Sequence, residues 1–217
     1  MRELPELFAN NRQWAAGKIA RDPQFFSKLA AQQAPRYLWI GCSDSRVPAN
    51  QIVGLDPGEL FVHRNVANLV KPEDANCLAV LEYAIGVLGV EHVIVCGHLG
   101  CGGIQAAFQG LVGGAVGEWL STVRTVIDTH RVLLESEGSK NPLDLLCRLN
   151  VIEQAAAVAT SLPVAAAWSR NRKVAIHAWV YALEDGLLQD LQFTVRNSSE
   201  VAENRVTAIA QARVLTG

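Results

Sequence analysis

The sequence predicts a single α/β domain built on a mostly parallel sheet. Residues 37–41, 59–63 and 92–97 are short apolar runs with the length and composition of buried strands. Helical patterns alternate with such runs along the chain, which is typical of a parallel sheet with right-handed crossovers and helices on its faces. Residues 173–181 and 187–195 flank a hairpin turn and predict an antiparallel pair. We therefore expect strand order 2-1-3-4, extended by an antiparallel edge strand.

The first helices are predicted before strand one and between strands two and three. Residues 1–34 form one or two helices, an N-terminal arm in which Asp22-Pro23 is a helix start. Residues 64–68 form a polar loop after the second strand. Pro72-Glu73-Asp74 then opens a helix that runs to about Leu88, and Gly89 ends it.

The second half of the chain is predicted to be helical up to the hairpin. A helical face recurs through residues 120–134, and Asn141-Pro142 starts a further helix. Ser161-Leu162-Pro163 breaks that helix, and a short one follows at residues 164–168. The tail after Asn197 looks weakly structured until the helix-compatible residues 206–214.

Composition limits the classes of function. The 217 residues are 50% hydrophobic and 18% charged, which suits one domain over 1–217, divided into the arm (1–34), an α/β core (35–196) and a tail (197–217). The net charge of -2 and the scattered arginines argue against a nucleic-acid partner. No apolar run approaches the ~18 residues of a membrane span, and the N-terminus lacks a secretory signal. Five cysteines without scaffold spacing favour a reduced, soluble, cytoplasmic protein with no membrane partner.

Metal-ligand residues follow the first and third strands. Cys42 and Asp44 come directly after the first, and His98 and Cys101 directly after the third. The carboxyl ends of parallel strands share one edge, and ligands bind there at the point where strand order reverses. Two thiolates, an imidazole and a carboxylate complete a tetrahedral zinc set. Asp44 is either the fourth ligand or a neighbour of the fourth position, within reach of Arg46, which would keep it ionised.

The other cysteines and histidines lack such neighbours. Three cysteines lie in apolar or helical patterns and are expected to be small buried hydrophobes: Cys77, Cys96 and Cys147. Four histidines are expected to be structural or on the surface, with a proton-transfer role left open for one of them: His63, His92, His130 and His177.

Rival interpretations fit the spacing less well. Cys42 and Arg46 are too close in sequence for the phosphate cradle of a cysteine phosphatase, and thiol redox chemistry would prefer a C-x-x-C motif, which is absent. A closed structural zinc site in a binding module usually draws on paired C-x-x-C knuckles, and an Asp–Arg pair beside the metal has little use there.

The two motifs resemble those of the beta-class carbonic anhydrases. Residues 42–46, Cys-Ser-Asp-Ser-Arg, match that family's first signature, and residues 98–103, His-Leu-Gly-Cys-Gly-Gly, match its second. The resemblance implies a lyase that interconverts carbon dioxide and bicarbonate, with one Zn2+ per chain held by Cys42, His98 and Cys101. It also implies that Asp44 and Arg46 form a catalytic dyad, and that the arm embraces a partner in a homodimer or a homotetramer made of two dimers. Rare members hydrolyse carbon disulfide or carbonyl sulfide, and the motifs alone leave them open.

A narrower resemblance concerns Trp39, Arg64 and Tyr181, with Val47 beside the dyad. These match a bacterial subgroup, the type II enzymes, that binds bicarbonate at a non-catalytic, allosteric site and switches off. In that subgroup Asp44 would leave Arg46 and ligate zinc. The alternative is a purely structural role, in which the two aromatic residues belong to the core and Arg64 is an ordinary surface residue.

Overall fold

The computed structural model describes residues 3–111, 113–136 and 141–215, which fall into two compact units, 1–34 and 35–217. The first unit contains helices α1 (Pro5–Arg21) and α2 (Phe25–Ala31). Between them Asp22 accepts a hydrogen bond from the Gln24 N–H at 2.9 Å and pairs with Lys28 at 2.8 Å. The helix start expected at Asp22-Pro23 thus lies early: a turn follows Asp22, and the second helix begins at Phe25 with Gln24 as its N-cap.

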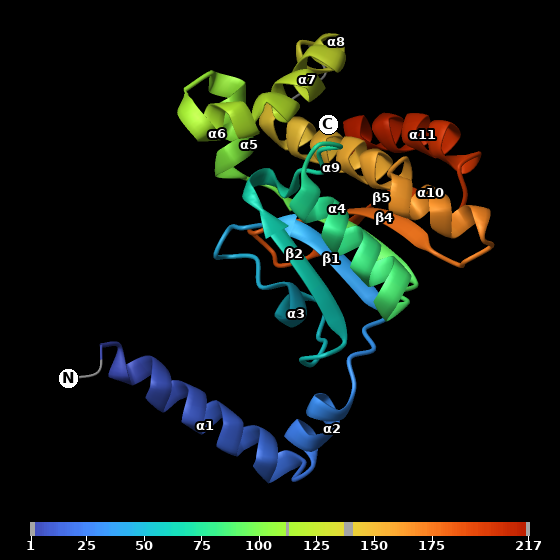
Figure 1. Cartoon of the computed structure of the whole chain (residues 1–217). Coiled ribbons are helices and arrows are strands. Elements are labelled where there is room, and N and C mark those ends of the chain that lie inside the picture. The colour runs from blue at the N-terminus through green and yellow to red at the C-terminus, as the bar shows by residue number, and fades with distance from the viewer. Residues whose placement is uncertain (1–2, 112, 137–140, 216–217) are drawn as a thin grey trace. The chain divides into compact units, whose positions relative to one another are not determined.

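The second unit contains a five-stranded sheet in the order β2-β1-β3-β4-β5 (Figure 1). Its strands are β1 (Tyr37–Cys42), β2 (Leu60–Asn65), β3 (His92–His98), β4 (Ala175–Tyr181) and β5 (Leu188–Val195). The first four are parallel, and β5 runs antiparallel to β4. The predicted topology is confirmed, with one difference: β2 continues through Arg64 and Asn65, which were expected in a loop.

The remaining segments are helical, and several begin at the caps that the sequence indicates. They are α3 (Ala49–Ile52), η1 (Val66–Asn68), α4 (Ala75–Glu82), η2 (Tyr83–Leu88), α5 (Gly102–Gln109), α6 (Gly114–Trp119), α7 (Ser121–Thr129), α8 (Arg131–Leu134), α9 (Pro142–Ala159), α10 (Leu162–Ser169) and α11 (Glu200–Val214). The Asp74 carboxylate accepts from the Asn76 N–H, and the Asn141 side chain accepts from the Asp144 N–H. These bonds satisfy helix-end donors that would otherwise lack partners.

The sheet is covered very differently on its two faces. Helices α4, α9, α10 and α11 contribute to the large core on one face, and α9 is buried along most of its length. On the other face Trp39 packs with Leu60 and Ile94, and Ala49 of the short helix α3 belongs to the same cluster. Figure 1 shows α3 on the side of the sheet away from the large helices. No single helix in the described ranges is long and apolar enough to cross a membrane, although α9 and α10 pass that test together as a pair bent by 53°.

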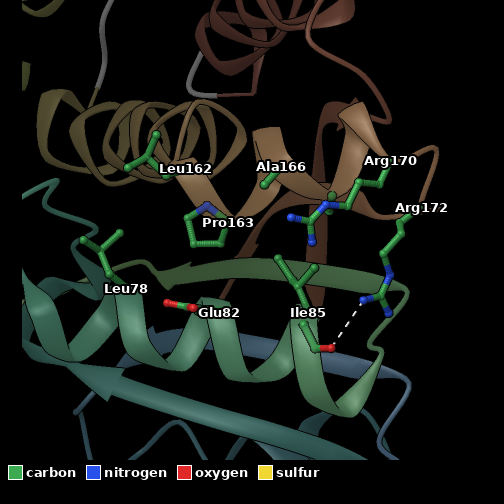
Figure 2. Close-up of a pocket in the computed structure, with 10 residues that line it drawn as sticks. Leu78, Glu82, Ile85, Leu162, Pro163, Ala166, Arg170 and Arg172 are labelled. Carbon is green, nitrogen blue, oxygen red and sulfur yellow. Dashed lines mark hydrogen bonds between the residues drawn. The ribbon is translucent and has the colours of Figure 1, made fainter.

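A surface hollow of about 380 Å³ lies between η2 and α10 (Figure 2). Leu78 and Ile85 line it from one side and Ala166 from the other, and the Arg172 guanidinium donates to the Gly86 carbonyl. The predicted metal ligands do not line it.

The expectation of a weakly structured tail is wrong. Helix α11 begins at Glu200, where Asn197 Oδ1 accepts from the Ser199 N–H at 3.0 Å. It packs on α9 and β5 through Ala208 and Ala212, which are fully buried. Alanine contributes little to an apolar pattern, so the sequence alone showed only the last part of this helix.

Candidate metal centre

The predicted ligands come together at the carboxyl edge of the sheet. Strand β1 ends at Cys42, β3 ends at His98, and Cys101 directly precedes α5. Their ligand atoms lie within 4.8 Å of one another, and the two sulfurs are 3.9 Å apart. All three side chains are buried. The structure thus joins the residues that sequence spacing placed at one sheet edge.

The imidazole of His98 leaves one nitrogen free for a metal ion. Its Nδ1 lies 3.0 Å from the Leu99 carbonyl, which can only accept, so Nδ1 carries the proton. The lone pair then resides on Nε2, which is buried and has no hydrogen-bond partner in the structure. A buried lone pair without a donor is costly, and a metal ion would satisfy it. Two sulfurs and this nitrogen fit the ligand set of a catalytic zinc site, which keeps a fourth position open.

The two thiols are linked by one hydrogen bond, in which either sulfur can be the donor. A bond donated by the Cys101 thiol lowers the pKa of Cys42, and the pKa of Cys101 is raised. Zinc binds thiolates, so a bound cation would displace the protons of these thiols.

Asp44 is held by Arg46 rather than lying in the ligand set. Asp44 Oδ1 accepts from the Arg46 Nε at 3.0 Å, and Oδ2 accepts from Nη2 at 2.7 Å. This bidentate pair holds the pKa of the Asp44 carboxyl far below its usual range. Oδ2 also lies 3.6 Å from His98 Nε2, so an ionised carboxylate borders the ligand set.

Trp39, Arg64 and Tyr181 lie on three different strands. Trp39 is buried in the smaller core, where Tyr181 packs against the same cluster. Arg64 instead reaches over the metal-site loop: its Nε donates to the Cys42 carbonyl at 2.8 Å, and its Nη2 donates to the Asp44 carbonyl. Sequence analysis assigned Arg64 a side-chain role at an anion site and missed this attachment to the loop that carries Asp44.

The remaining predicted residues have structural partners. Cys77, Cys96 and Cys147 are buried, as expected. His130 lies 2.6 Å from Glu153, and His92 lies 3.1 Å from His177. His63 groups with Asp74 and Cys77, and its Nε2 faces the Asn65 amide at 3.3 Å.

Two buried amides near the centre were missed. Asn150 and Gln154 lie on α9 and hydrogen-bond to the segment that follows β2. Their signal was present in the sequence, because they are amide side chains at i and i+4, on one face of a helix that is mostly apolar.

The fold and the site define an α/β protein with a Cys-His-Cys site of the kind that holds zinc, and the comparisons with known proteins identify its family. The family model for carbonic anhydrase matches residues 37–188. A carbonic anhydrase of Emericella nidulans is 47% identical over 187 residues, covering 86% of this chain and 82% of that protein. A carbonic anhydrase of Pseudomonas aeruginosa is 38% identical over 192 residues, covering 83% and 84%.

Solved structures extend the match. The beta-carbonic anhydrase of Coccomyxa in complex with acetazolamide superposes with a TM-score of 0.88 at 38% identity, covering 94% of this chain and 92% of that one. A tetrameric beta-carbonic anhydrase of Sordaria macrospora superposes with a TM-score of 0.82 at 37% identity, covering 88% and 97%. The chain belongs to the beta class of the carbonic anhydrase family, whose enzymes interconvert carbon dioxide and bicarbonate.

Proposed function

We propose that the chain hydrates carbon dioxide at one zinc ion held by Cys42, His98 and Cys101, with Asp44 and Arg46 as the catalytic pair. The observation that carries this assignment is the buried, unpartnered lone pair of His98, which lies between two thiols and beside an ionised carboxylate. A closed structural site would have no use for a carboxylate fixed next to an open position.

Bound zinc would supply a Lewis acid that lowers the pKa of water at the open position. Asp44 remains ionised because Arg46 neutralises it, so it can only accept hydrogen bonds. Held by both oxygens, it orients the attacking water toward carbon dioxide instead of rotating freely. Because Cys42 and Cys101 are anionic ligands, we expect activity to require mildly alkaline pH.

Zinc content tests the ligand assignment. Cys42→Ala and Cys101→Ala should each lose most of the metal, because each removes one of three ligands. Cys77→Ala is the matched control, since it removes an equally buried thiol outside the triad. Full zinc in both ligand variants by elemental analysis would refute the assignment.

We also propose that bicarbonate inhibits the enzyme at Trp39, Arg64 and Tyr181, as the resemblance to the type II subgroup implies. What supports this is the attachment of Arg64 to the Cys42 and Asp44 carbonyls. A guanidinium that turns to bind an anion must release those carbonyls, and the loop that carries Asp44 would then be free to move. A few kcal/mol of differential binding suffices to shift such a two-state equilibrium.

The bicarbonate dependence of the rate at about pH 8 tests this regulation. Trp39→Phe removes the indole N–H while keeping most of the packing, and Arg64→Ala removes the charge. Both should require more bicarbonate for half-inhibition, whereas Arg170→Ala, a change to a distant surface arginine, should not. Inhibition curves identical to wild type in both variants would refute the allosteric site.

We further propose a homodimer or homotetramer in the cytoplasm. Helix α1 leaves large apolar side chains about half exposed within this chain, among them Leu7, Trp14 and Ile19, and extended apolar surfaces usually mark an interface. The Sordaria macrospora relative is tetrameric. Light scattering after size exclusion should give two or four chains, and a monomer at micromolar concentration would refute the proposal.

The five free cysteines suit a reducing compartment, which cell fractionation can test.

A further inference from the structure

Two buried amides on α9 form a ladder that ends at the loop after β2, residues 66–70. Gln154 Nε2 donates to Asn150 Oδ1 at 3.2 Å, and Asn150 Nδ2 donates to the Ala67 carbonyl at 3.0 Å. Gln154 Oε1 accepts from the Val70 N–H at 2.8 Å. Asn150 is 1% exposed and Gln154 2% exposed. Buried amides at consecutive helical turns are retained in apolar helices only when they have specific partners.

The loop that they hold is strained. Ala67 and Asn68 both have left-handed backbone, with φ of 65° and 50°, although neither is a glycine. Such conformations persist where surrounding structure over-determines them, and they cluster at functional sites. Asn65 holds the same loop from the other side: its Oδ1 accepts from the Leu69 N–H at 2.7 Å, and its Nδ2 donates to the Leu69 carbonyl at 2.8 Å.

This loop touches the strand ends that carry the metal ligands. It packs against β1 and β3, the two strands that end at Cys42 and His98. On the β3 side Asn68 and Val151 press against Gly97, the residue before His98, so closely that a Cβ there would lie 3.1 Å from Asn68 Oδ1. The left-handed turn thus lies between the amide ladder and the ligands.

We propose that Asn150 is a positioning residue for the metal centre, because its amide fixes the turn at Ala67 and Asn68 that packs against the ends of β1 and β3 beside the ligands. The inference rests on the proposed zinc site. Both ends of the Asn150 amide are used, so its orientation is specified: Gln154 occupies the oxygen, and only the nitrogen can face the Ala67 carbonyl. An aspartate at 150 would place an oxygen against that carbonyl, and an alanine would leave the carbonyl buried without a donor.

Loss of the Asn150–Ala67 hydrogen bond should loosen the turn that supports the strand ends beside Cys42 and His98. Outer-shell groups that orient metal ligands affect metal affinity by about 10–100-fold. We therefore expect zinc to leave Asn150→Asp and Asn150→Ala about 10–100-fold faster than wild type. Gln154→Ala acts one link further away and should show a smaller increase.

The test is the rate of zinc release from the folded, zinc-loaded protein to a chromogenic chelator at 25 °C. Val158→Ala is the control, because Val158 is a fully buried residue of the same helix at its far end. It should lower the melting temperature while leaving zinc release unchanged. If Asn150→Ala does not fold, Asn150→Asp and Gln154→Ala give the same comparison.

The outcomes separate this inference from the function it rests on. Zinc release that is faster than wild type in the Asn150 or Gln154 variants, and unchanged in Val158→Ala, supports the positioning role of Asn150. Equal release from all folded variants overturns it and leaves the zinc site intact. A wild-type protein that binds no zinc overturns both.

Discussion

The close packing of β3 against α9 next to His98 can be tested by adding one methyl group at Gly97. An ideal Cβ at this position would lie 2.4 Å from Val151 Cγ2, where carbon atoms normally approach to about 3.5–4.0 Å. Val151 is fully buried on α9, and β3 is the central strand, so neither can move outward freely. We expect Gly97→Ala to destabilise the protein by about 1–3 kcal/mol, the usual cost of overpacking a core.

The magnitude can be checked by removing the atom responsible. Val151→Ala alone should also destabilise, by about 1–3 kcal/mol, because it leaves a cavity. The double variant should be at least ~1 kcal/mol more stable than the sum of the two single effects, since the new methyl group occupies the space that Val151 vacates.

Urea unfolding at a fixed, saturating zinc concentration measures all four proteins, since bound metal contributes to apparent stability. For a chain of this size, 1 kcal/mol corresponds to about 2–4 °C in melting temperature, which gives an independent reading. Additive effects within ~0.5 kcal/mol would mean that Gly97 and Val151 do not compete for space, and would refute the packing argument.

Two further predictions concern stability. Burial and the neighbouring His92 lower the pKa of His177 to about 4, against about 6.5 in the unfolded chain. Between these two values the unfolded state binds a proton that the folded state does not, so the free energy of unfolding should fall as the pH drops from 7 to 5. His177→Gln should reduce that loss by about 1 kcal/mol, allowing for partial exposure, and melting curves with the same pH dependence as wild type would contradict it. Ala208→Glu should detach α11 and lower the free energy of unfolding by more than about 3 kcal/mol, because it buries a charge. Thr207→Glu, at the neighbouring exposed position, should leave the free energy of unfolding nearly unchanged. Equal melting temperatures for these two variants would contradict the docking of α11.

Much of the fold was predictable because its signals are local. Apolar runs of strand length and caps such as Asp74 and Asn141 specify elements without knowledge of their partners. The docked helix α11 was underestimated because its buried contacts are alanines, whose burial is decided by tertiary packing. The left-handed turn at Ala67 and Asn68 was also beyond the sequence, because residues without glycine's freedom adopt it only when a remote helix holds them.

The metal centre likewise has features that the sequence predicts and features that it does not. Cys42, His98 and Cys101 were predictable because parallel strands deliver their carboxyl ends to one edge. The structure places Asp44 on Arg46, whereas the spacing alone allowed Asp44 either in the ligand set or beside it, because both positions lie within reach of one short loop. The attachment of Arg64 to backbone carbonyls likewise depends on where a long side chain finds acceptors after folding.

The most direct test of the catalytic assignment is the rate of carbon dioxide hydration, followed by stopped flow with a pH indicator at about pH 8.5 and low bicarbonate. Wild type and Asp44→Asn are compared at equal, measured zinc content, so that metal loss cannot account for a difference. We expect strong catalysis by wild type and a loss of about 10²-fold in Asp44→Asn, the cost expected when the attacking water loses the group that orients it. Equal rates in the two proteins, or no catalysis by zinc-loaded wild type, would contradict the assignment of Asp44 at this centre.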